Sequence, residues 1–486
     1  MYFLLNEQRS DGSWTGQNRY GLVPTLSATE ALLSVVRNPP AQSRPPIRRG
    51  VLTSSVHRGL DALFRRLNVD EPAPLPDTVA VEIVVPSLIA EINSHLDQDL
   101  PIGLEEWRGR RLIQHPGGNI RLLAGLRAAV GRGHPLPMKL LHSLEIYGDA
   151  ARGARLIDPM RCNVGCSPAA TAVWLGDSEV RAGCHPGVRY LEAVQRRGGG
   201  PVPVAAPLAV FERVWVLCTL AGAGLVPRPY RGLVRSLHAA FGEFGVAGGP
   251  GLPPDADDTA TALSALARLG SPRSPEVLWV YRAHDGHFAC FPDERTPSTS
   301  TNAHVLQSFG DCLRLDPPQC TRYADAMARI TAWLCERQEA DGSWSDKWHA
   351  SPYYATACAA LALARYGGDL ATGTLAKAVD WLLDTQRPDG SWGRWAGTCE
   401  ETAYAVQVLA RVRTVHAGEV TGRALGRGCE WLRRDGEPPY PPLWHDKDLY
   451  TPTRIVRAEG LAALRLAASS PHFAPAEFRP VGKESR

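Results

Sequence analysis

Three carboxylic acids lie within four positions in the segment Asp255-Ala256-Asp257-Asp258. Carboxylates packed this closely in an apolar cavity cannot all ionise, so one of them would keep its proton near neutral pH. Such a group could protonate an alkene, because an alkene is a very weak base and needs a donor that holds its proton until the substrate arrives. The resulting carbocation would need aromatic faces and no loose water around it. The segment is therefore a candidate proton donor.

The same acids have two simpler interpretations. Asp is favoured at a helix N-cap, and this segment leads into a helical pattern over residues 261–269 that ends at Gly270. Clustered carboxylates also bind Mg²⁺ or Ca²⁺. A DDxxD metal motif, however, would need a third acid where Thr259-Ala260-Thr261 stands. The Gly/Pro-rich residues 248–254, directly before the acids, predict a shaped active-site loop and favour the proton donor.

A repeated turn predicts the elements that must position these acids. The motif Gln-x-x-Asp-Gly-Ser-Trp begins at Gln8, Gln338 and Gln386. Helical patterns flank the last two copies, at residues 330–335, 355–365, 378–383 and 402–412. Each Asp-Gly marks a turn, because Gly adopts positive φ at little cost. Helix, tight turn and helix at a period of about 50 residues indicate a toroid of helical hairpins. We expect the Gln amides to bond backbone at helix ends and the Trp rings to pack over the next hairpin.

The rest of the sequence predicts an almost wholly α-helical chain of two domains. Its 486 residues are 44% hydrophobic and 21% charged, which is a globular composition with a sizeable core. Residues 79–85 have the composition of a strand but run into Pro86 and a helical pattern, so a short β segment there stays open. Gly and Pro at residues 198–203 separate two apolar helical regions and indicate domains 1–203 and 204–486.

Charge and cysteine content narrow the class of protein. The net charge is +3, from 53 basic and 50 acidic residues, and no basic run supports nucleic-acid binding. Eleven scattered cysteines without a CxxC pair indicate free thiols in a reducing cytoplasm. The uncharged, apolar stretch at residues 214–226 is shorter than the roughly 20 residues of a membrane-spanning helix. We therefore expect a cytoplasmic protein without a transmembrane segment.

Together, the acidic segment and the three repeated turns resemble the DxDD and QW motifs of class II terpene cyclases. The closest resemblance is to bacterial class II diterpene cyclases, which include copalyl, halimadienyl and terpentedienyl diphosphate synthases. It covers nearly the whole chain and extends to six further segments, at residues 75–79, 141–145, 166–172, 346–349, 400–404 and 448–452. The resemblance implies an all-α fold of two α-barrel (α/α toroid) domains in a γ–β arrangement with the cavity between them. Residues 1–203 would form the γ domain, and residues 204–486 the β domain with the DxDD motif.

The resemblance also implies an activity, that of an isomerase of the intramolecular lyase class. Protonation would start the cyclisation of geranylgeranyl diphosphate to a bicyclic diterpenyl diphosphate of the labdane, halimane or clerodane type, with the diphosphate retained. The product would then pass to a separate class I terpene synthase or to a phosphatase. Proton donation would belong to Asp257, with Asp255 and Asp258 tuning and orienting it.

Further site residues follow from the same resemblance. Residues 301–306 are similar to a segment of squalene–hopene cyclases in which a His hydrogen-bonds the acid motif. That role would belong to His304, with Asn302 as a second candidate; the alternative is a core histidine with a satisfied bond. Trp348, Tyr353 and Tyr354 would line the path of the carbocation, unless they are plain core.

The diphosphate requires cationic side chains or Mg²⁺. Lys447 is the first candidate, because its segment matches the family. Four further candidates share only a basic side chain, which is usually solvated: Lys139, Lys347, Arg454 and Arg457.

A magnesium motif of the family usually lies just before the region of residues 81–83. Asp70, Glu71 and Asp77 are the acids available there, and they form a thinner set than the family's motif. The family also has a helix with a Ser-x-Tyr-Asp-Thr-like motif ahead of the first QW turn. Because this chain begins almost at that turn, we expect one barrel helix to be missing.

Four alternative functions stay open from the sequence. A prenyltransferase β subunit would share the α/α toroid but would need a zinc site and a partner chain. A non-catalytic helical scaffold would not need three clustered aspartates. Within the resembled family, farnesyl diphosphate could replace the C20 substrate and give a drimane skeleton. Squalene cyclisation is disfavoured, because those chains are longer and richer in repeats.

Overall fold

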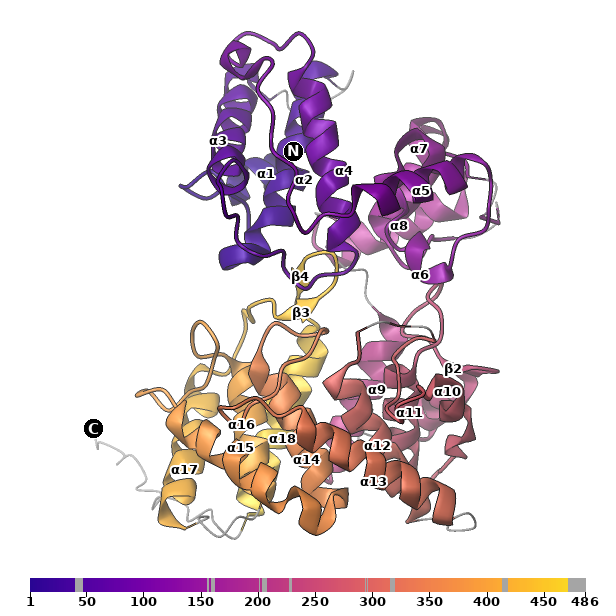
Figure 1. Cartoon of the computed structure of the whole chain (residues 1–486), viewed down its shortest axis with the longest axis vertical. Helices are drawn as coiled ribbons and strands as arrows, with labels where there is room; N and C mark the ends of the chain where they lie inside the picture. Colours follow the sequence, from indigo (N-terminus) through magenta and orange to yellow (C-terminus); the bar gives the residue numbers. More distant parts are fainter. Residues whose placement is uncertain are drawn as a thin grey trace, which may run out of the picture. The chain divides into compact units, whose positions relative to one another are not determined.

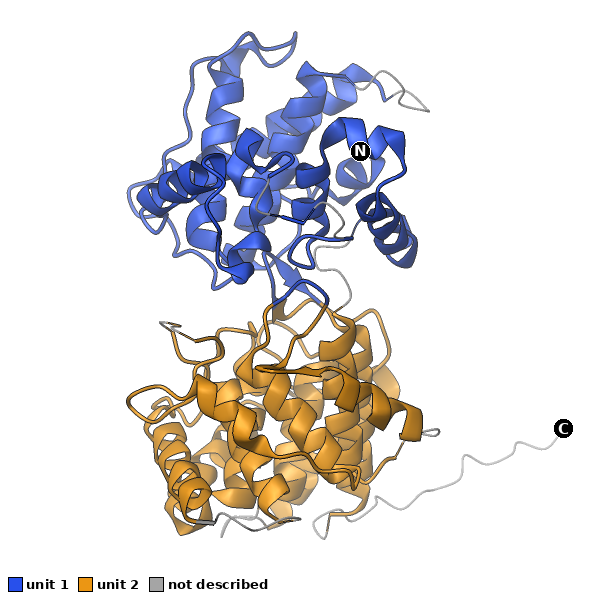
Figure 2. Ribbon diagram, turned by 90° about the vertical axis from the view of Figure 1, so that its right-hand side faces the viewer, with its two compact units in different colours: residues 1–206, 250–252, 445–450 blue, residues 207–249, 253–444, 451–486 orange. Residues whose placement is uncertain are grey.

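A computed structural model describes residues 1–39, 47–154, 157–158, 162–200, 202, 208–226, 230–292, 294, 296–314, 320–412 and 418–470. The chain folds into two compact units, coloured separately in Figure 2. Unit 1 comprises Met1–Ala206, Pro250–Leu252 and His445–Tyr450. Unit 2 comprises Pro207–Gly249, Pro253–Trp444 and Thr451–Arg486. The expected boundary at Pro203 lies outside the described residues.

Unit 2 contains a closed ring of helices. Its six members in the described part of the chain are α9 (Ala209–Gly222), α11 (Ala256–Arg268), α12 (Thr299–Leu313), α14 (Pro352–Tyr366), α16 (Cys399–Arg411) and α18 (Thr453–Ala468). Each helix packs against the next in this order, and α18 packs against α9 (Figure 1). The buried faces of α11, α14 and α18 are rich in Ala, which lets these helices approach their neighbours closely. This ring encloses the site described below.

All six helices of the ring run in the same direction. At their amino-terminal ends, Asp257 of α11 contacts His304 of α12, and Arg454 of α18 pairs with Glu212 of α9. At their carboxyl-terminal ends, Arg268 of α11 bonds Asp311 of α12. Arg411 at the end of α16 donates to the carbonyl at the end of α9. The helix dipoles therefore add, with partial positive charge at the end that carries the acid motif.

Outer elements surround the ring and connect its members. They are α10 (Tyr230–Ala239), η4 (Pro275–Tyr281), α13 (Cys320–Glu336), η5 (Gly368–Ala371), α15 (Thr372–Asp384) and α17 (Glu419–Asp435). Short two-stranded pairs are formed by β1 (Phe241–Gly242) with β2 (Gly245–Val246), and by β3 (Trp444–His445) with β4 (Leu449–Tyr450). The predicted all-α fold is thus confirmed, with strands of only two residues each.

The repeated turns are built as the sequence predicted. Gln338 donates through Nε2 to the carbonyl of Gly342 at 2.9 Å and to that of Thr374, on the next hairpin, at 2.8 Å. Trp344 donates through Nε1 to the carbonyl of Leu334 at 2.8 Å, and Gly342 has a φ of 97°. The copies at Gln8 and Gln386 make the equivalent bonds. These side chains therefore hold consecutive hairpins together.

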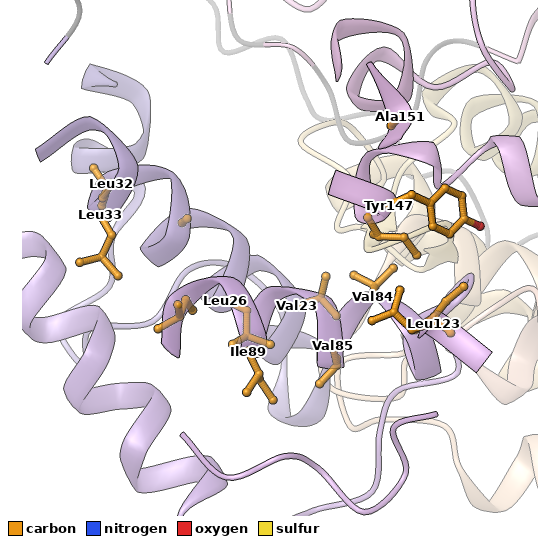
Figure 3. Close-up of a cluster of buried hydrophobic side chains, with 14 of the residues drawn as sticks. Val23, Leu26, Leu32, Leu33, Val84, Val85, Ile89, Leu123, Tyr147 and Ala151 are labelled. Carbon is orange, nitrogen blue, oxygen red and sulfur yellow. The ribbon is translucent and has the colours of Figure 1, made fainter. Parts of the chain in front are cut away.

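Unit 1 is also helical. Its elements are α1 (Tyr2–Glu7), η1 (Asn18–Gly21), α2 (Leu22–Arg37), α3 (Arg49–Leu67), α4 (Val81–Leu96), η2 (Glu105–Trp107), α5 (Ile120–Gly131), α6 (Met138–Leu141), η3 (Leu144–Ala151), α7 (Pro168–Ala182) and α8 (Pro186–Arg197). Buried side chains such as Val23 and Leu26 of α2 face Val85 and Ile89 of α4 (Figure 3). This contact forms the centre of the apolar core of unit 1.

The strand that residues 79–85 could have formed is a helix instead. Helix α4 begins at Val81, after Ala80 adopts a left-handed φ of 56°. Pro86 lies inside the helix and lacks the N–H that would bond the carbonyl of Glu82. The N–H of Asn119 bonds that carbonyl at 2.6 Å, so the helix continues through the proline without an unsatisfied group.

Two other expectations can be compared with the described residues. Their helices are all too short or too polar to cross the hydrocarbon layer of a bilayer. The cysteines whose side chains the structure describes are all free thiols, as their scattered spacing predicted.

Candidate active site

The acid motif is held at the amino-terminal end of α11 by two other backbone segments. Asp255 is the N-cap, and its Oδ1 accepts the N–H of Asp258 at 2.8 Å. The N–H of Asp255 bonds the carbonyl of Val246 at 3.1 Å, and the N–H of Ala256 bonds that of Cys290 at 2.9 Å. The helix-cap interpretation is thus true of Asp255. Helix capping does not account for Asp257 and Asp258, which are as deeply buried as Asp255.

The glycine-rich loop before the motif closes over it. A Cβ at Gly248 would lie 2.7 Å from Oδ2 of Asp258, which is closer than real Cβ atoms approach. The carbonyl of Gly248 accepts the N–H groups of Val210 and Phe211 at the start of α9. The loop therefore covers the acids and joins them to the next helix of the ring.

Burial changes the acidity of two of the three carboxyls. Asp255, Asp257 and Asp258 are 8%, 7% and 6% exposed. Burial raises the pKa of Asp255 to about 7. Burial, and then the charge and hydrogen bond of Asp255, raise the pKa of Asp258 well above its usual range. The motif therefore keeps a proton near neutral pH, which is the property that the sequence argument required.

Asp257 contacts His304, as the resemblance implied. Oδ1 of Asp257 lies 2.6 Å from Nδ1 of His304, although the two residues are 47 positions apart. The edge of the Trp215 ring packs against the His304 ring, with centroids 5.4 Å apart. The second oxygen of Asp257 makes none of the hydrogen bonds found among the described residues, so it is the oxygen available to a substrate. The structure thus brings Asp257 and His304 together in a buried pair.

Asn302 is placed differently from the expectation. Its Oδ1 accepts the N–H of Phe288 at 2.8 Å, and its Nδ2 donates to the carbonyls of Phe288 and Ser298 at 3.0 and 2.8 Å. The amide is therefore occupied by backbone and does not bond the aspartates. Asn302 thereby fixes the backbone near Phe288, and the nearby carbonyl of Cys290 accepts the N–H of Ala256. Asn302 therefore supports the acid motif indirectly, through this segment.

The three expected aromatic residues have different surroundings. Tyr354 is buried on the axis side of α14, where its ring stacks on His349 with centroids 4.7 Å apart. Tyr353 packs against Trp381 of the outer helix α15, with centroids 4.6 Å apart, and belongs to the core instead of a substrate path. Trp348 is half-buried in the loop before α14. Only Tyr354 among the three faces the inside of the ring.

A cavity lies inside the ring beside the acid–histidine pair. Its volume is about 90 Å³, and its lining includes Trp215, Thr261, His304, Tyr354 and Glu459. Sequence reasoning missed Glu459, because a single Glu within an otherwise ordinary helix has no local signal.

The basic residues expected to bind the diphosphate mostly have protein partners. In unit 1, Nζ of Lys447 lies 2.6 Å from Oε1 of Glu145 and 2.7 Å from Oγ of Ser167. In unit 2, Lys347 pairs with Glu294, and Arg454 lies 3.4 Å from Glu212. Lys139 and Arg457 are exposed. Lys447 is therefore a half-buried cation that is already paired with Glu145.

A second buried pair, His142 with Asp446, was not predicted. Nε2 of His142 lies 2.6 Å from Oδ1 of Asp446, and its Nδ1 lies 2.6 Å from the carbonyl of Gly165. Burial opposes the charged form of His142, but Asp446 raises the pKa of His142 above its usual value. Burial likewise acts against ionised Asp446, yet His142 and Lys447 lower its pKa. The family-like segment 141–145 contains His142, whereas Asp446 lies two positions before the family-like segment 448–452.

The residues proposed for Mg²⁺ do not assemble a metal site. Asp70, Glu71 and Asp77 are exposed on the stretch between α3 and α4. Within the ranges that the structure describes, no group of three His, Cys, Asp or Glu residues converges as metal ligands would. We therefore assign no step of the chemistry to a metal held by these residues.

Comparison with known proteins agrees with this geometry. Residues 294–457 match the family described as the squalene–hopene cyclase C-terminal domain. An ent-copalyl diphosphate synthase of Streptomyces sp. (strain KO-3988) is 43% identical over 98% of this chain and 89% of its own length. A labda-7,13-dienyl diphosphate synthase of Streptomyces clavuligerus is 42% identical over 95% and 84%. The solved structure of ent-copalyl diphosphate synthase from Streptomyces platensis superimposes with a TM-score of 0.90 at 46% identity, covering 96% of this chain and 91% of the other.

Proposed function

This chain belongs to the class II diterpene cyclases, and from that premise we propose that it cyclises geranylgeranyl diphosphate with Asp257 as the proton donor. The product in this proposal is a bicyclic diterpenyl diphosphate of the labdane, halimane or clerodane type that keeps its diphosphate. The names of the copalyl and labda-7,13-dienyl diphosphate synthases support a C20 substrate over farnesyl diphosphate. Family membership leaves no support for a prenyltransferase subunit or a non-catalytic scaffold.

The observation that carries the proposal is the buried contact between Asp257 and His304 at the positive end of the parallel helices. In the first step, the O–H bond of Asp257 breaks and a C–H bond forms at the terminal alkene. The carboxylate left behind accepts the N–H of His304 and lies where the helix dipoles favour negative charge. Asp255 and Asp258 bond each other and hold a further proton beside it. Loss of a proton from the cyclic carbocation completes the isomerisation.

The proposal is tested by incubating the protein separately with geranylgeranyl and farnesyl diphosphates in buffer with Mg²⁺. Dephosphorylation and mass spectrometry of the alcohols then identify the products. We expect a bicyclic C20 alcohol and little conversion of the C15 substrate. Recovery of linear geranylgeraniol alone would contradict the proposal, whereas a cyclic C15 alcohol as the main product would change the substrate to farnesyl diphosphate.

Two further parts of the proposal rest on the family resemblance. Because the product keeps its diphosphate, we propose that a separate class I terpene synthase or a phosphatase consumes it. The free thiols support a cytoplasmic site of action. A requirement for Mg²⁺ stays a prediction, and a comparison of turnover with Mg²⁺ and with EDTA checks it.

A further inference from the structure

The cavity inside the helix ring has the character of a water site. Its volume of about 90 Å³ is large enough to hold water. The lining is mixed, and its polar part includes Thr219, Thr261 and Gln407 beside His304 and Glu459. The Oγ1 of Thr261 is buried and has no hydrogen-bond partner among the described residues. Ordered water usually satisfies buried hydroxyls of this kind, so this cavity is a place where water would bind.

Glu459 is a buried acid that the proposed proton transfer does not use. It lies in the middle of α18 and is 6% exposed. Its two oxygens accept the hydroxyl of Thr219 from α9 at 2.7 Å and the amide N–H of Gln407 from α16 at 2.5 Å. Burial raises the pKa of Glu459, and these two bonds and His304 offset only part of that effect. Burial therefore favours the protonated carboxyl, which can donate a hydrogen bond to water in the cavity.

His304 connects this cavity to the acid motif. Its Nδ1 faces Asp257, while the ring also lines the cavity, so Nε2 is the nitrogen left to face the water. A neutral imidazole carries one hydrogen, and the partner of one nitrogen decides which nitrogen carries it. Only the form with hydrogen on Nδ1 can donate to Asp257 and stabilise the carboxylate that proton transfer leaves. The group that supplies a hydrogen bond to Nε2 therefore decides how strong an acid Asp257 is.

We propose that Glu459 is a positioning residue: through water in the ring cavity it sends a hydrogen bond toward Nε2 of His304 and keeps the ring hydrogen on Nδ1, facing Asp257. The inference rests on the proposed function, because it takes Asp257 as the proton donor. Without a donor on the cavity side, the hydrogen moves to Nε2, and a lone pair on Nδ1 then faces the developing carboxylate. Proton transfer becomes slower, while substrate binding is unaffected because Glu459 makes no contact with substrate in this proposal.

Two substitutions at Glu459 separate hydrogen-bond donation from packing. Glu459→Gln keeps an N–H donor of similar shape, and we expect kcat within about threefold of the unchanged protein. Glu459→Met fills the same volume without a donor, and we expect kcat to fall about 10- to 100-fold at unchanged KM, the usual cost of removing such a partner. As a matched control, Thr219→Val removes one tie on the same carboxyl but leaves its hydrogen. We expect this variant to have a lower Tm and nearly unchanged kcat.

Nitrogen NMR of histidine-labelled protein reads the ring hydrogen directly, and the spectrum of His304→Asn assigns the His304 signals. We expect hydrogen on Nδ1 in the unchanged protein and in Glu459→Gln, and on Nε2 in Glu459→Met. Hydrogen on Nε2 in the unchanged protein, full kcat in Glu459→Met, or an equal loss of kcat in Thr219→Val would each overturn the inference. If Asp257→Asn is inactive while Glu459→Met is fully active, only the role of Glu459 fails. If Asp257→Asn is active, the proposed function fails instead.

Discussion

The three aspartates of the motif share one turn of α11 but have different partners. Asp255 caps the helix by accepting the backbone N–H of Asp258, and the two carboxyls also share a hydrogen bond. Asp257 is bonded on one oxygen by His304 and keeps the other for a substrate. At the scale of residues, the acid is therefore chosen by which carboxyl retains an open oxygen beside a hydrogen-bond donor.

Asp257→Asn should remove the first step of the reaction. We expect turnover of geranylgeranyl diphosphate to fall on the order of 10³-fold, because the amide cannot supply the proton. The amide has nearly the same shape, so circular dichroism and Tm should stay close to those of the unchanged protein. Activity equal to that of the unchanged protein would place the acid at another residue.

The rate of cyclisation should fall as pH rises through about 7. Burial raises the pKa of Asp255 to about 7, and an ionised Asp255 opposes the second negative charge that proton donation creates on the neighbouring Asp257. A raised pKa keeps the acid form up to that pH and loses it above, so the loss belongs on the alkaline side. Steady-state kinetics measured from about pH 5 to about pH 9 check this expected loss of rate. A rate that stays constant across the alkaline half contradicts it.

Parallel packing of six helices also places six carboxyl-terminal helix ends together at the other end of the ring. Partial negative charge collects at the carboxyl ends, and the last turns of α11, α14 and α16 carry Arg268, Arg365 and Arg411. Burial, and then repulsion by Arg268 and Arg365, lower the pKa of Arg411 to about 10. Asp311, at the end of α12, lies 2.7 Å from Nε of Arg268 and 3.1 Å from Arg365. This carboxylate holds the arginines together.

Asp311→Asn should destabilise unit 2, because Arg268 and Arg365 would lose the buried carboxylate that they share. We expect the free energy of unfolding to fall by about 3–5 kcal/mol, the usual cost of breaking a buried ion pair by removing one partner. Urea denaturation followed by circular dichroism measures the change. Asp325→Asn, on an exposed position of α13, is the matched control and should change stability by less than about 0.5 kcal/mol. Equal midpoints for the two variants would contradict the prediction.

At the scale of the whole molecule, the units do not correspond to continuous pieces of chain. His445–Tyr450 belongs to unit 1, although the chain before and after it belongs to unit 2. Within unit 1 this segment supplies Asp446 to His142 and Lys447 to Glu145. The backbone carbonyl of Asp446 also accepts the N–H of Val79 at 2.8 Å. Unit 1 therefore depends on residues that arrive late in the sequence.

Asp446→Asn should destabilise unit 1 by an amount that depends on pH. The raised pKa of His142 means that its contribution is complete below its unfolded value of about 6.5 and disappears as pH rises through the folded value. The lowered pKa of Asp446 means that its contribution is complete above its unfolded value of about 3.9 and disappears as pH falls through the folded value. The loss of Tm in the variant should therefore be largest between these limits, near pH 5 to 6.

Differential scanning calorimetry at several pH values measures this dependence. Asp149→Asn removes a carboxylate that is ion-paired but 92% exposed, and it should leave Tm nearly unchanged at every pH. A loss of Tm in Asp446→Asn that is constant from acid to alkaline pH would contradict a role for the ion pair.

Much of this protein could be predicted from local sequence. A Gln-x-x-Asp-Gly-Ser-Trp turn needs only residues close in the chain, namely a glycine at positive φ and an Asp that accepts the N–H two positions on. Other features are equally local in the sequence: the clustered acids, the predicted end of α11 at Gly270 and the hairpin period. They determined the helical class, the toroid and the family, and they pointed to Asp257.

Only the tertiary structure decided which side chains meet. Asn302 and His304 lie two positions apart on α12 and therefore on different faces, so one holds backbone and the other contacts the acid. Tyr353 and Tyr354 divide in the same way between the outer core and the ring interior. Lys447 finds its carboxylate 302 positions away, and Glu459 faces His304 only because the ring closes. Helical periodicity predicts which residues share a face of a helix. The partner of each face depends on packing between segments that are distant in sequence, so no local pattern can predict that partner.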